Sequence, residues 1–177
     1  ITHPKKLHLR DIKNSENDLD LYRSIFDLEK KTKVFYLKDI NSKIGISILK
    51  KNKIDYIFSL SSRFIFKDKI ISHYKNKIFN IHPSLLPEER GGGTFTYRIL
   101  NKQKFCAATI HLLDKDIDAG QILLSSKKQK LKNEALPINY LKYTNLIYKS
   151  LIKMFVKKIK NNSKFILKNQ NNSKGWY

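Results

Sequence analysis

The chain has 177 residues, of which 41% are hydrophobic, so it is long enough for one domain with a sizeable core and too short for two comfortable ones. Its 36 lysines and arginines outnumber 15 acidic residues, which gives a formal net charge of +21. The basic residues are spread through nearly every segment beside Asn and Ile, so codon composition explains the excess better than a nucleic-acid-binding surface. The net charge is compatible with a globular protein whose basic rim attracts an anionic substrate.

The single cysteine, Cys106, excludes an internal disulfide and fits a reducing compartment. It precedes a predicted buried strand, so a packed core residue is favoured over a nucleophile. The sequence has no apolar run long enough to cross a bilayer and no signal-peptide pattern. Neither membrane insertion nor secretion is indicated, and we expect a cytoplasmic protein of unknown oligomeric state.

The first part of the chain predicts helices that alternate with strands. Residues 5–11 form a basic stretch of low definition. We predict helices over residues 16–31 and 41–51, and strands over residues 34–37 and 55–60. This alternation is typical of an α/β fold with a mostly parallel sheet that is covered by helices on both faces.

The second part predicts further strands and then a long helix. Strands are expected over residues 107–113 and 121–124, with a helix over residues 94–100 between the central strand and the first of them. Beyond residue 126, apolar residues follow the helical period of about 3.6 residues, which predicts an amphipathic helix over residues 137–160 that covers the sheet. The segment 161–177 is rich in Asn, Lys and Ser, and we expect a loose polar tail.

The central predicted strand carries two polar side chains on one face. Phe79, Asn80, Ile81 and His82 alternate apolar and polar residues until Pro83 ends the run. Asn80 and His82 therefore project from the same face, because side chains two positions apart on a strand share a face. An imidazole moves a proton near neutral pH, and an amide donates hydrogen bonds to a developing oxyanion. This pair therefore indicates a candidate site for proton transfer and oxyanion stabilisation at the end of the strand.

An acidic loop follows the strand at 107–113, in an otherwise basic chain. It contains Asp114, Asp116 and Asp118 before the turn at Ala119 and Gly120. A loop at the end of a strand is where a scaffold usually holds catalytic groups. Each residue taken singly also fits an ordinary turn or a solvated loop. A metal site from the histidines and aspartates is not supported by any usual ligand spacing, so we expect no metal.

Two ordered motifs carry a resemblance to a known family. The first is N-I-H-P-S-L-L-P followed by an Arg-Gly segment, at residues 80–91, and the second is T-I-H-L-L-D-K-D-I-D-A-G-Q-I-L, at residues 109–123. Together they resemble the folate-dependent formyltransferases, which include glycinamide ribonucleotide, methionyl-tRNA and sugar-nucleotide N-formyltransferases and the related formyltetrahydrofolate hydrolases. The resemblance is strong from about Asp55 to Ser126. It implies a Rossmann-like catalytic domain over residues 1–160.

The resemblance also implies roles for individual residues. It places the catalytic Asn, His and Asp of the family on Asn80, His82 and Asp118, and the conserved His of its second motif on His111. For His111, contact with the substrate and a role in the core behind the catalytic groups both remain open. The expected folate-binding residues lie in the S-L-L-P loop and in the earlier stretch where relatives wrap the pterin: Ser84, Leu85, Leu86, Pro87, Arg63 and Ile65. Near the acceptor we expect Gly92 of the triple glycine and Tyr97, with Arg98 beside it at the pocket rim.

The implied activity is transfer of a formyl group from N10-formyltetrahydrofolate to a primary amine. A nucleotide-linked amino sugar is the favoured acceptor. Methionyl-tRNA is weakened because those relatives carry an added tRNA-binding domain, and glycinamide ribonucleotide because the phosphate-binding opening of that branch is not seen. We expect that the chain lacks the first strand and helix of the family, as a fragment or as a divergent form. A hydrolase, or a basic nucleic-acid-binding derivative without catalysis, remains an alternative.

Overall fold

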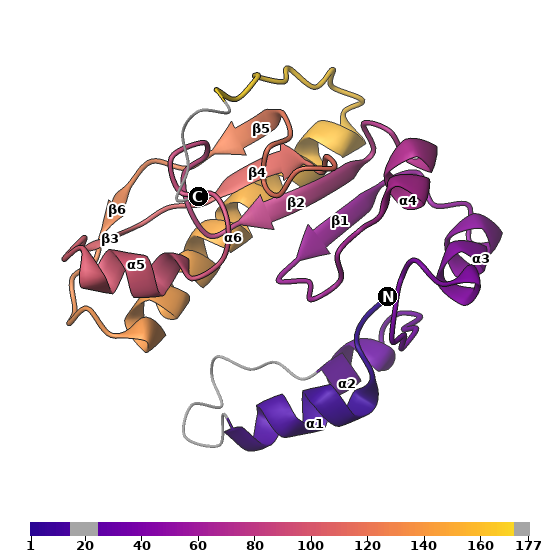
Figure 1. Cartoon of the computed structure of the whole chain (residues 1–177), viewed down its shortest axis with the longest axis horizontal. Helices are drawn as coiled ribbons and strands as arrows, with labels where there is room; N and C mark the ends of the chain where they lie inside the picture. Colours follow the sequence, from indigo (N-terminus) through magenta and orange to yellow (C-terminus); the bar gives the residue numbers. More distant parts are fainter. Residues whose placement is uncertain (15–24, 172–177) are drawn as a thin grey trace. The chain divides into compact units, whose positions relative to one another are not determined.

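The computed structural model describes residues 1–14 and 25–171 and divides the chain into two compact units. The first unit contains residues 1–54 and 62–70, and the second contains residues 55–61 and those from 71 onward. Figure 1 labels the elements of both units. All the strands of the main sheet and the whole of the predicted polar cluster belong to the second unit.

The first unit is built from helices. They are α1 (Lys5–Asn14), α2 (Ile25–Glu29) and α3 (Lys43–Lys51). Helix α3 forms as expected, since the Ser42 hydroxyl accepts a hydrogen bond of 3.1 Å from the Gly45 N–H at its N-terminus.

Three predicted elements of the first unit differ from the structure or lie partly outside its described residues. The stretch expected to have low definition is helix α1. The strand expected over residues 34–37 is reduced to a single bridge between Thr2 and Tyr36. Most of the helix expected over residues 16–31 lies outside the described residues, which include its later part as α2.

The second unit contains a four-stranded sheet in the order β1-β2-β4-β5. The strands are β1 (Ile57–Leu60), β2 (Ile78–His82), β4 (Thr109–Leu112) and β5 (Ile122–Ser125). Strands β1 and β2 are parallel, whereas β2 pairs antiparallel with β4 and β4 pairs antiparallel with β5.

The α/β class is therefore confirmed, but the expectation of a mostly parallel sheet is wrong for the described strands. The connection from β1 to β2 contains helix α4 (Asp68–His73), as a parallel crossover requires. The loop from β4 to β5, residues 113–121, contains no helix and simply reverses the chain. A short loop of this kind joins antiparallel neighbours, so the second half of the sheet runs in alternating directions.

Two further features border the main sheet. Strands β3 (Phe105–Cys106) and β6 (Gln129–Lys130) form a separate two-stranded sheet. Beyond helix α6 (Pro137–Lys160), the chain returns along β5, where Lys168 bridges Ile122 (Figure 1). Over residues 163–171 the expected loose tail is thus an extended segment held against the sheet.

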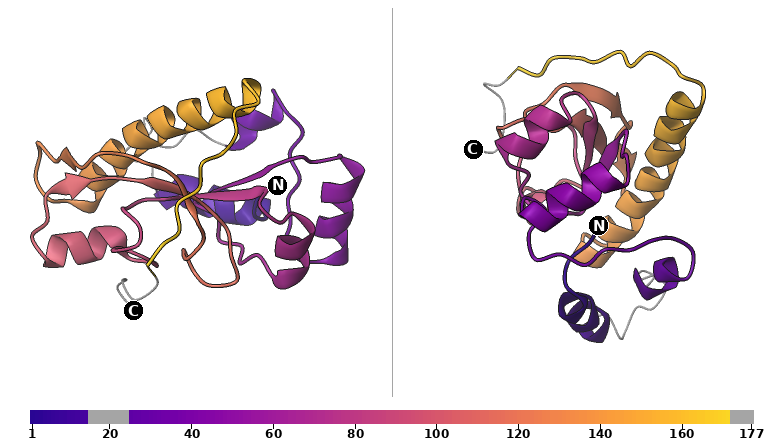
Figure 2. Two further views of the ribbon diagram at one scale, coloured as in Figure 1. Left: turned by 90° about the horizontal axis from the view of Figure 1, so that it is seen from above. Right: turned by 90° about the vertical axis from the view of Figure 1, so that its right-hand side faces the viewer.

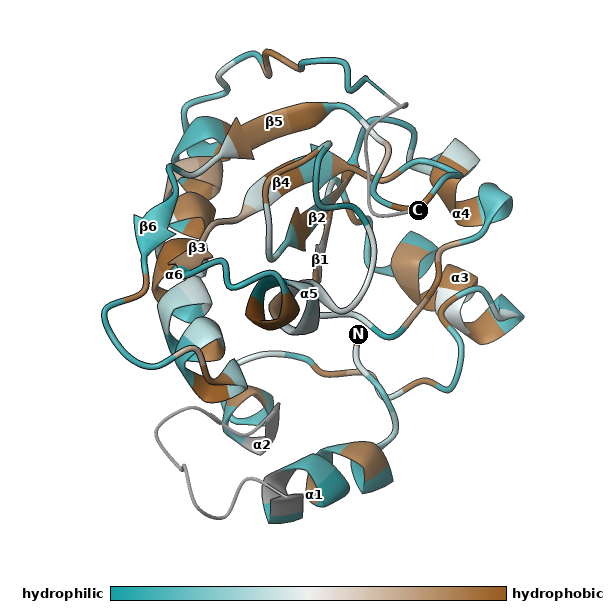
Figure 3. Ribbon diagram, turned by 60° about the vertical axis from the view of Figure 1, so that its left-hand side comes forward, coloured by the Kyte–Doolittle hydropathy of each residue, from teal (hydrophilic) through white to brown (hydrophobic). Residues whose placement is uncertain are grey.

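Helix α6 supplies the largest part of the core. It lies along one face of the sheet (Figure 2), where its buried side chains recur at helical spacing. The buried residues of α6 are Tyr140, Thr144, Ile147, Tyr148, Leu151 and Phe155. They pack against a cluster that includes Phe79 and Ile110 from the sheet. Figure 3 shows the apolar strand β5 in brown and the polar strand β6, which belongs to the other sheet, in teal.

Cys106 is fully buried in this core, in agreement with the packing role expected for it. Within the described ranges, no helix is both long and apolar enough to cross a membrane.

Phe155 joins α6 to the sheet and to the returning segment. Its ring lies 4.9 Å from the ring of Phe79 and 5.0 Å from that of Phe58, measured between centroids. We expect Phe155→Ala to lower the free energy of unfolding by about 3–5 kcal/mol, because it leaves a cavity under the sheet. Urea unfolding measures this change. Met154→Ala is the matched control, since Met154 is exposed on the same helix, and an equal loss in both variants would contradict the packing described.

Candidate active site

Strand pairing brings three polar side chains together at the end of the sheet. Asn80 and His82 lie on one face of β2, while Ile81 between them is buried in the core. In the antiparallel register, Asn80 is the partner of His111 on β4. Residues that face each other on neighbouring strands have side chains in contact. The amide of Asn80 accordingly lies 3.2 Å from Nε2 of His111.

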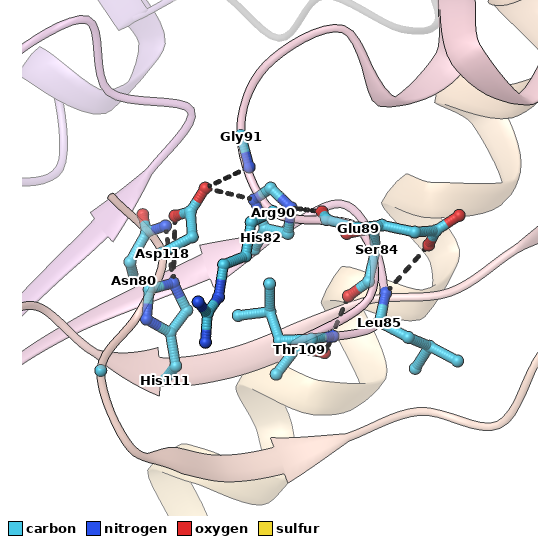
Figure 4. Close-up of polar contacts among 12 residues, drawn as sticks. Asn80, His82, Ser84, Leu85, Glu89, Arg90, Gly91, Thr109, His111 and Asp118 are labelled. Carbon is cyan, nitrogen blue, oxygen red and sulfur yellow. Dashed lines mark hydrogen bonds and ion pairs between the residues drawn. The ribbon is translucent and has the colours of Figure 1, made fainter. Parts of the chain in front are cut away.

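The loop after β4 returns the carboxylate of Asp118 to the same place (Figure 4). Its Oδ2 lies 3.3 Å from Nδ1 of His82, and its Oδ1 lies 3.4 Å from Nε2 of His111. The Gly91 N–H donates a further hydrogen bond of 3.0 Å to Oδ2. Only 12% of the Asp118 side chain is exposed. One carboxylate is thus shared by two imidazoles and a main-chain amide.

The backbone of this loop is specialised for that placement. Asp118 has φ of 50°, in the left-handed region that Asp tolerates better than most residues. Gly120 passes so close to β4 that a Cβ there would collide with the carbonyl oxygen of Leu112. The Ala-Gly turn seen in the sequence is therefore required for the loop to fold back over the strand.

The hydrogen bonds of His82 fix its orientation. Nε2 lies 2.6 Å from the main-chain carbonyl of Glu89, so this nitrogen carries a hydrogen and donates it. Nδ1, which faces Asp118, is then the nitrogen that gains or loses a proton. When it is protonated, the imidazolium donates to the carboxylate, as in a general acid–base pair.

His111 is oriented in a similar way. Its Nδ1 donates to the carbonyl of Leu112 at 2.8 Å, which leaves Nε2 facing Asn80 and Asp118. In the neutral ring, Nε2 accepts from the amide of Asn80. In the charged ring, it donates to Oδ1 of Asp118. The side chain of His111 is fully buried, so its position is fixed by these partners.

Burial and neighbouring charges shift the titration of this cluster. Burial lowers the pKa of His82, and the Asp118 carboxylate opposes this effect only in part. Burial also opposes ionisation of Asp118, but the hydrogen bond of His111, the charges of both imidazoles and the Gly91 N–H outweigh it and lower the pKa of that carboxyl. At neutral pH the cluster therefore holds an ionised carboxylate beside a neutral His82.

Glu89 and Arg98 form a buried ion pair that supports the site. Arg98 donates from Nη2 and Nε to the two carboxylate oxygens at 2.6 Å and 3.1 Å, and its side chain is fully buried. Among the described residues, the Nη1 of Arg98 has no hydrogen-bond partner, and the guanidinium lies over the ring of Phe105, 4.6 Å from its centroid. The expectation that Arg98 lies at the pocket rim is wrong, because α5 (Thr94–Leu100) turns this residue inward.

The S-L-L-P loop is tied down from both sides. Ser84 is buried and donates to the carbonyl of Glu89 at 2.7 Å, and the Leu85 N–H donates to the Glu89 carboxylate at 3.2 Å. The Thr109 hydroxyl donates to the Ser84 carbonyl and accepts from the Leu86 N–H. The loop keeps this shape through its own side chains, and only Leu85 and Pro87 of the motif are partly exposed.

The other predicted binding residues have different surroundings. Gly92 is exposed, with open space where a Cβ would stand, and Tyr97 on α5 is 42% exposed. Arg63 and Ile65 belong to the first unit. There Arg63 forms a 2.9 Å ion pair with Asp11, and Ile65 is exposed. The folate and acceptor contacts expected of these four residues stay predictions.

In residues 1–14 and 25–171, no group of three or more His, Cys, Asp or Glu side chains has the geometry of a metal site.

A model of the formyl transferase family matches residues 46–154, which is more than half of the chain and includes the whole cluster. This chain belongs to the formyl transferase family. The motif residues that carry the resemblance in the sequence are the ones that meet around Asp118.

Individual members of the formyl transferase family resemble the chain to different extents. The bifunctional polymyxin resistance protein ArnA of Wigglesworthia glossinidia brevipalpis is 36% identical over 124 residues, which cover 70% of this chain and 18% of that protein. A methionyl-tRNA formyltransferase of Finegoldia magna is 34% identical over 99 residues, which cover 56% of this chain and 32% of that protein. The chain thus spans a third or less of these curated relatives.

A solved structure also matches the chain. It is the N-formyltransferase from Helicobacter canadensis in complex with folinic acid and dTDP-3-aminofucose, with 31% identity and a TM-score of 0.52. The match covers 67% of this chain and 44% of that chain. The fold of this formyl transferase family member is therefore shared with a relative of known structure.

The pKa shifts of the cluster predict a loss of stability in acid. Because the pKa of His82 is lower in the folded chain than its ordinary value of 6.5, the unfolded chain binds a proton first as the pH falls. Asp118 adds a further loss of stability as the pH falls below 3.8, its ordinary pKa, since folding also lowers the pKa of this carboxyl. We expect the free energy of unfolding to fall between about pH 7 and pH 5, and to fall less in His82→Gln. Urea unfolding at each pH measures the slope.

His73→Gln is the control for this measurement, because His73 is exposed on α4. The interpretation is contradicted if His82→Gln keeps the wild-type slope while His73→Gln reduces it.

The ion pair predicts an asymmetry between single and double variants. Arg98→Met leaves the Glu89 carboxylate buried without its partner, and we expect a loss of about 3–5 kcal/mol in the free energy of unfolding. Glu89→Leu/Arg98→Met replaces both charges by apolar groups, and it should recover most of that loss. Thermal and urea unfolding of the three chains test this. A double variant less stable than Arg98→Met would show that the pair has another role.

Proposed function

We propose that the chain is a folate-dependent N-formyltransferase that moves a formyl group from N10-formyltetrahydrofolate to the primary amine of a nucleotide-linked amino sugar. The observation that carries the proposal is the shared Asp118 carboxylate, 3.3 Å from His82 and 3.4 Å from His111, with Asn80 in the same cluster. Asn80, His82 and Asp118 are the residues to which the family resemblance assigns catalysis. The reaction needs these side chains close together, because one stabilises the oxyanion while the others move the proton.

The reaction breaks the bond between N10 and the formyl carbon and forms a bond between that carbon and the acceptor nitrogen. A neutral amine attacks, and a tetrahedral species with negative charge on oxygen forms. In the proposal, the half-buried Asn80 donates an amide N–H to this oxygen, because one of its two amide hydrogens remains after the contact with His111. Asn80 does not titrate, so it stabilises the oxyanion across the whole pH range.

The acceptor nitrogen loses a proton, and N10 of the folate gains one. His82 cannot use Nε2 for this transfer, because Nε2 is bonded to the Glu89 carbonyl. The proton therefore moves through Nδ1 of His82 and the Asp118 carboxylate, directly or through a water molecule. The low pKa of Asp118 keeps it ionised, which stabilises the positive charge that develops on the attacking amine.

Binding of the co-substrate is assigned to the S-L-L-P loop. Its hydrogen bonds to Glu89 and Thr109 fix the backbone before a ligand arrives. Leu85 and Pro87 retain partly exposed apolar surface against which a pterin packs. The Helicobacter canadensis relative, whose structure contains folinic acid, supports a reduced folate as the co-substrate.

Two relatives support different acceptors. The Helicobacter canadensis structure contains dTDP-3-aminofucose and supports a nucleotide-linked amino sugar. The Finegoldia magna relative, a methionyl-tRNA formyltransferase, supports methionyl-tRNA as a second candidate. Water in place of the amine would make the same cluster a hydrolase. The experiment therefore has to distinguish between these three acceptors.

The proposal predicts that Asn80, His82 and Asp118 are each required. We expect Asn80→Ala to lower kcat about 10²- to 10³-fold through loss of an oxyanion donor. His82→Gln and Asp118→Asn should lower it at least as far. Release of tetrahydrofolate from N10-formyltetrahydrofolate, measured in the presence of dTDP-3-aminofucose, gives the rate. Asp114→Asn is the control, since Asp114 is an exposed carboxylate of the same loop.

The same assay separates the candidate acceptors. Release that depends on the amino sugar supports the proposal, whereas release that depends on methionyl-tRNA supports the second candidate. Release without any amine identifies a hydrolase. Wild-type rates in Asn80→Ala, His82→Gln and Asp118→Asn would contradict the proposed mechanism.

A further inference from the structure

The returning C-terminal segment reaches the catalytic cluster. Ile122 and Lys168 exchange two main-chain hydrogen bonds, of 2.8 Å and 2.9 Å, which fasten the segment to β5. Next to this bridge, the Gln121 amide donates to Asn169 at 2.6 Å. Upstream, the ring of Phe165 packs 5.2 Å from that of Phe79 in the core. The segment is thus anchored before it reaches residue 170.

Gln170 uses both ends of its amide there. Its Oε1 accepts from Nε and Nη2 of Arg90, at 3.1 Å and 2.8 Å. Its Nε2 donates to the carbonyl of Asp118 at 2.9 Å and to that of Gly120 at 2.6 Å. An amide has two donor hydrogens and one oxygen with two lone pairs, so these four bonds exhaust its capacity.

These bonds connect the two loops of the site. Arg90 directly precedes Gly91, whose N–H holds the Asp118 carboxylate. The carbonyls of Asp118 and Gly120 belong to the loop with the left-handed residue and the close glycine. Gln170 therefore links the side chain of Arg90, next to Gly91, to the main chain of residues 118 and 120, on the two sides of the contact that places the carboxylate between the imidazoles.

The left-handed backbone conformation of Asp118 costs free energy, and the bonds of Gln170 offset that cost. A non-glycine residue in that region costs on the order of 1–3 kcal/mol and persists only where its surroundings hold it. Two charge-assisted bonds to Arg90 and two bonds to loop carbonyls are enough to offset such a cost. Without them, the loop is free to relax and carry the carboxylate away from His82.

We propose that Gln170 is a positioning residue, which holds the loop of residues 118–120 against Arg90 so that the Asp118 carboxylate stays between His82 and His111. It acts through the main chain of Asp118 and does not touch the reacting atoms. The inference rests on the proposed formyl transfer for its effect on rate. Its effect on the geometry of the cluster is independent of any substrate.

The first test compares variants of the full chain in the formyl transfer assay. We expect Gln170→Ala to lower kcat about 10²-fold, the loss associated with a misplacement of about 1 Å, with little change in KM for the folate. Gln170→Glu keeps an oxygen for Arg90 but places a carboxylate oxygen against two carbonyls, so it should not restore kcat. Asn169→Ala is the matched control, because it removes the neighbouring bond to Gln121 and none to Arg90 or to the main chain of residues 118–120.

A second readout needs no substrate and keeps the test independent of the proposed function. The side chains that carry charge around His82 are Asp118, His111 and Glu89. Because the Asp118 carboxylate opposes the effect of burial on His82, its displacement should lower the midpoint of the His82 titration, measured by NMR of the imidazole. We expect this shift in Gln170→Ala and not in Asn169→Ala.

The two readouts together decide between the possible results. A wild-type chain that transfers no formyl group, with a midpoint that still shifts in Gln170→Ala, removes the proposed function and supports the positioning role. A midpoint and a kcat that are the same in Gln170→Ala and Asn169→Ala overturn the positioning role, whatever the activity of the wild type.

Discussion

The largely buried carboxylate of Asp118 is the group around which the candidate site is built. A charge with little exposure requires partners, and here they come from three separate segments: His82 at the end of β2, His111 on β4 and the Gly91 N–H. Each of the two imidazoles is itself oriented by a main-chain carbonyl, since His82 donates to Glu89 and His111 donates to Leu112. The orientation of both rings is therefore set by the protein itself.

The antiparallel pairing of β2 with β4 determines where the acidic loop begins. It places Asn80 directly opposite His111 and the last residue of β4 opposite Phe79, so the loop after β4 leaves the sheet beside the start of β2. The loop then folds back along the strands, and the Asp118 carboxylate reaches His82 at the other end of β2. A short connection makes this half of the sheet antiparallel, and it therefore also requires a loop that doubles back.

Much of this was predictable from the sequence, because the relevant signals are local. Alternation placed Asn80 and His82 on one face, and helical periodicity gave both ends of α6. Helices α3 and α5 were likewise predicted within a residue or two. Strands β3 and β6 have two residues each, which is too short to leave a pattern. Strand direction was missed because it depends on connections and not on composition.

The supporting residues of the site were not predictable in this way. Glu89 and Arg98 are a typical surface pair by residue type, and only the structure places them in the interior. Gln170 lies in a polar stretch that has the composition of a solvated tail. Its partner Asp118 is 52 positions earlier, so no window of sequence contains both. A Gln or an Arg gives a signal only when its distant partner is already known.

That separation has a consequence for how the molecule is made. A ribosome adds residues from the N-terminus, so a nascent chain exposes Asn80, His82 and Asp118 well before Gln170 has been synthesised. During that interval the sheet lacks the segment that pairs with β5, and the acidic loop has no contact with it. The site is therefore completed late, after its chemical groups are already in place along the chain. The contacts of residues 168–170 with β5 and with the acidic loop form only after those residues have been synthesised, later than the motif residues.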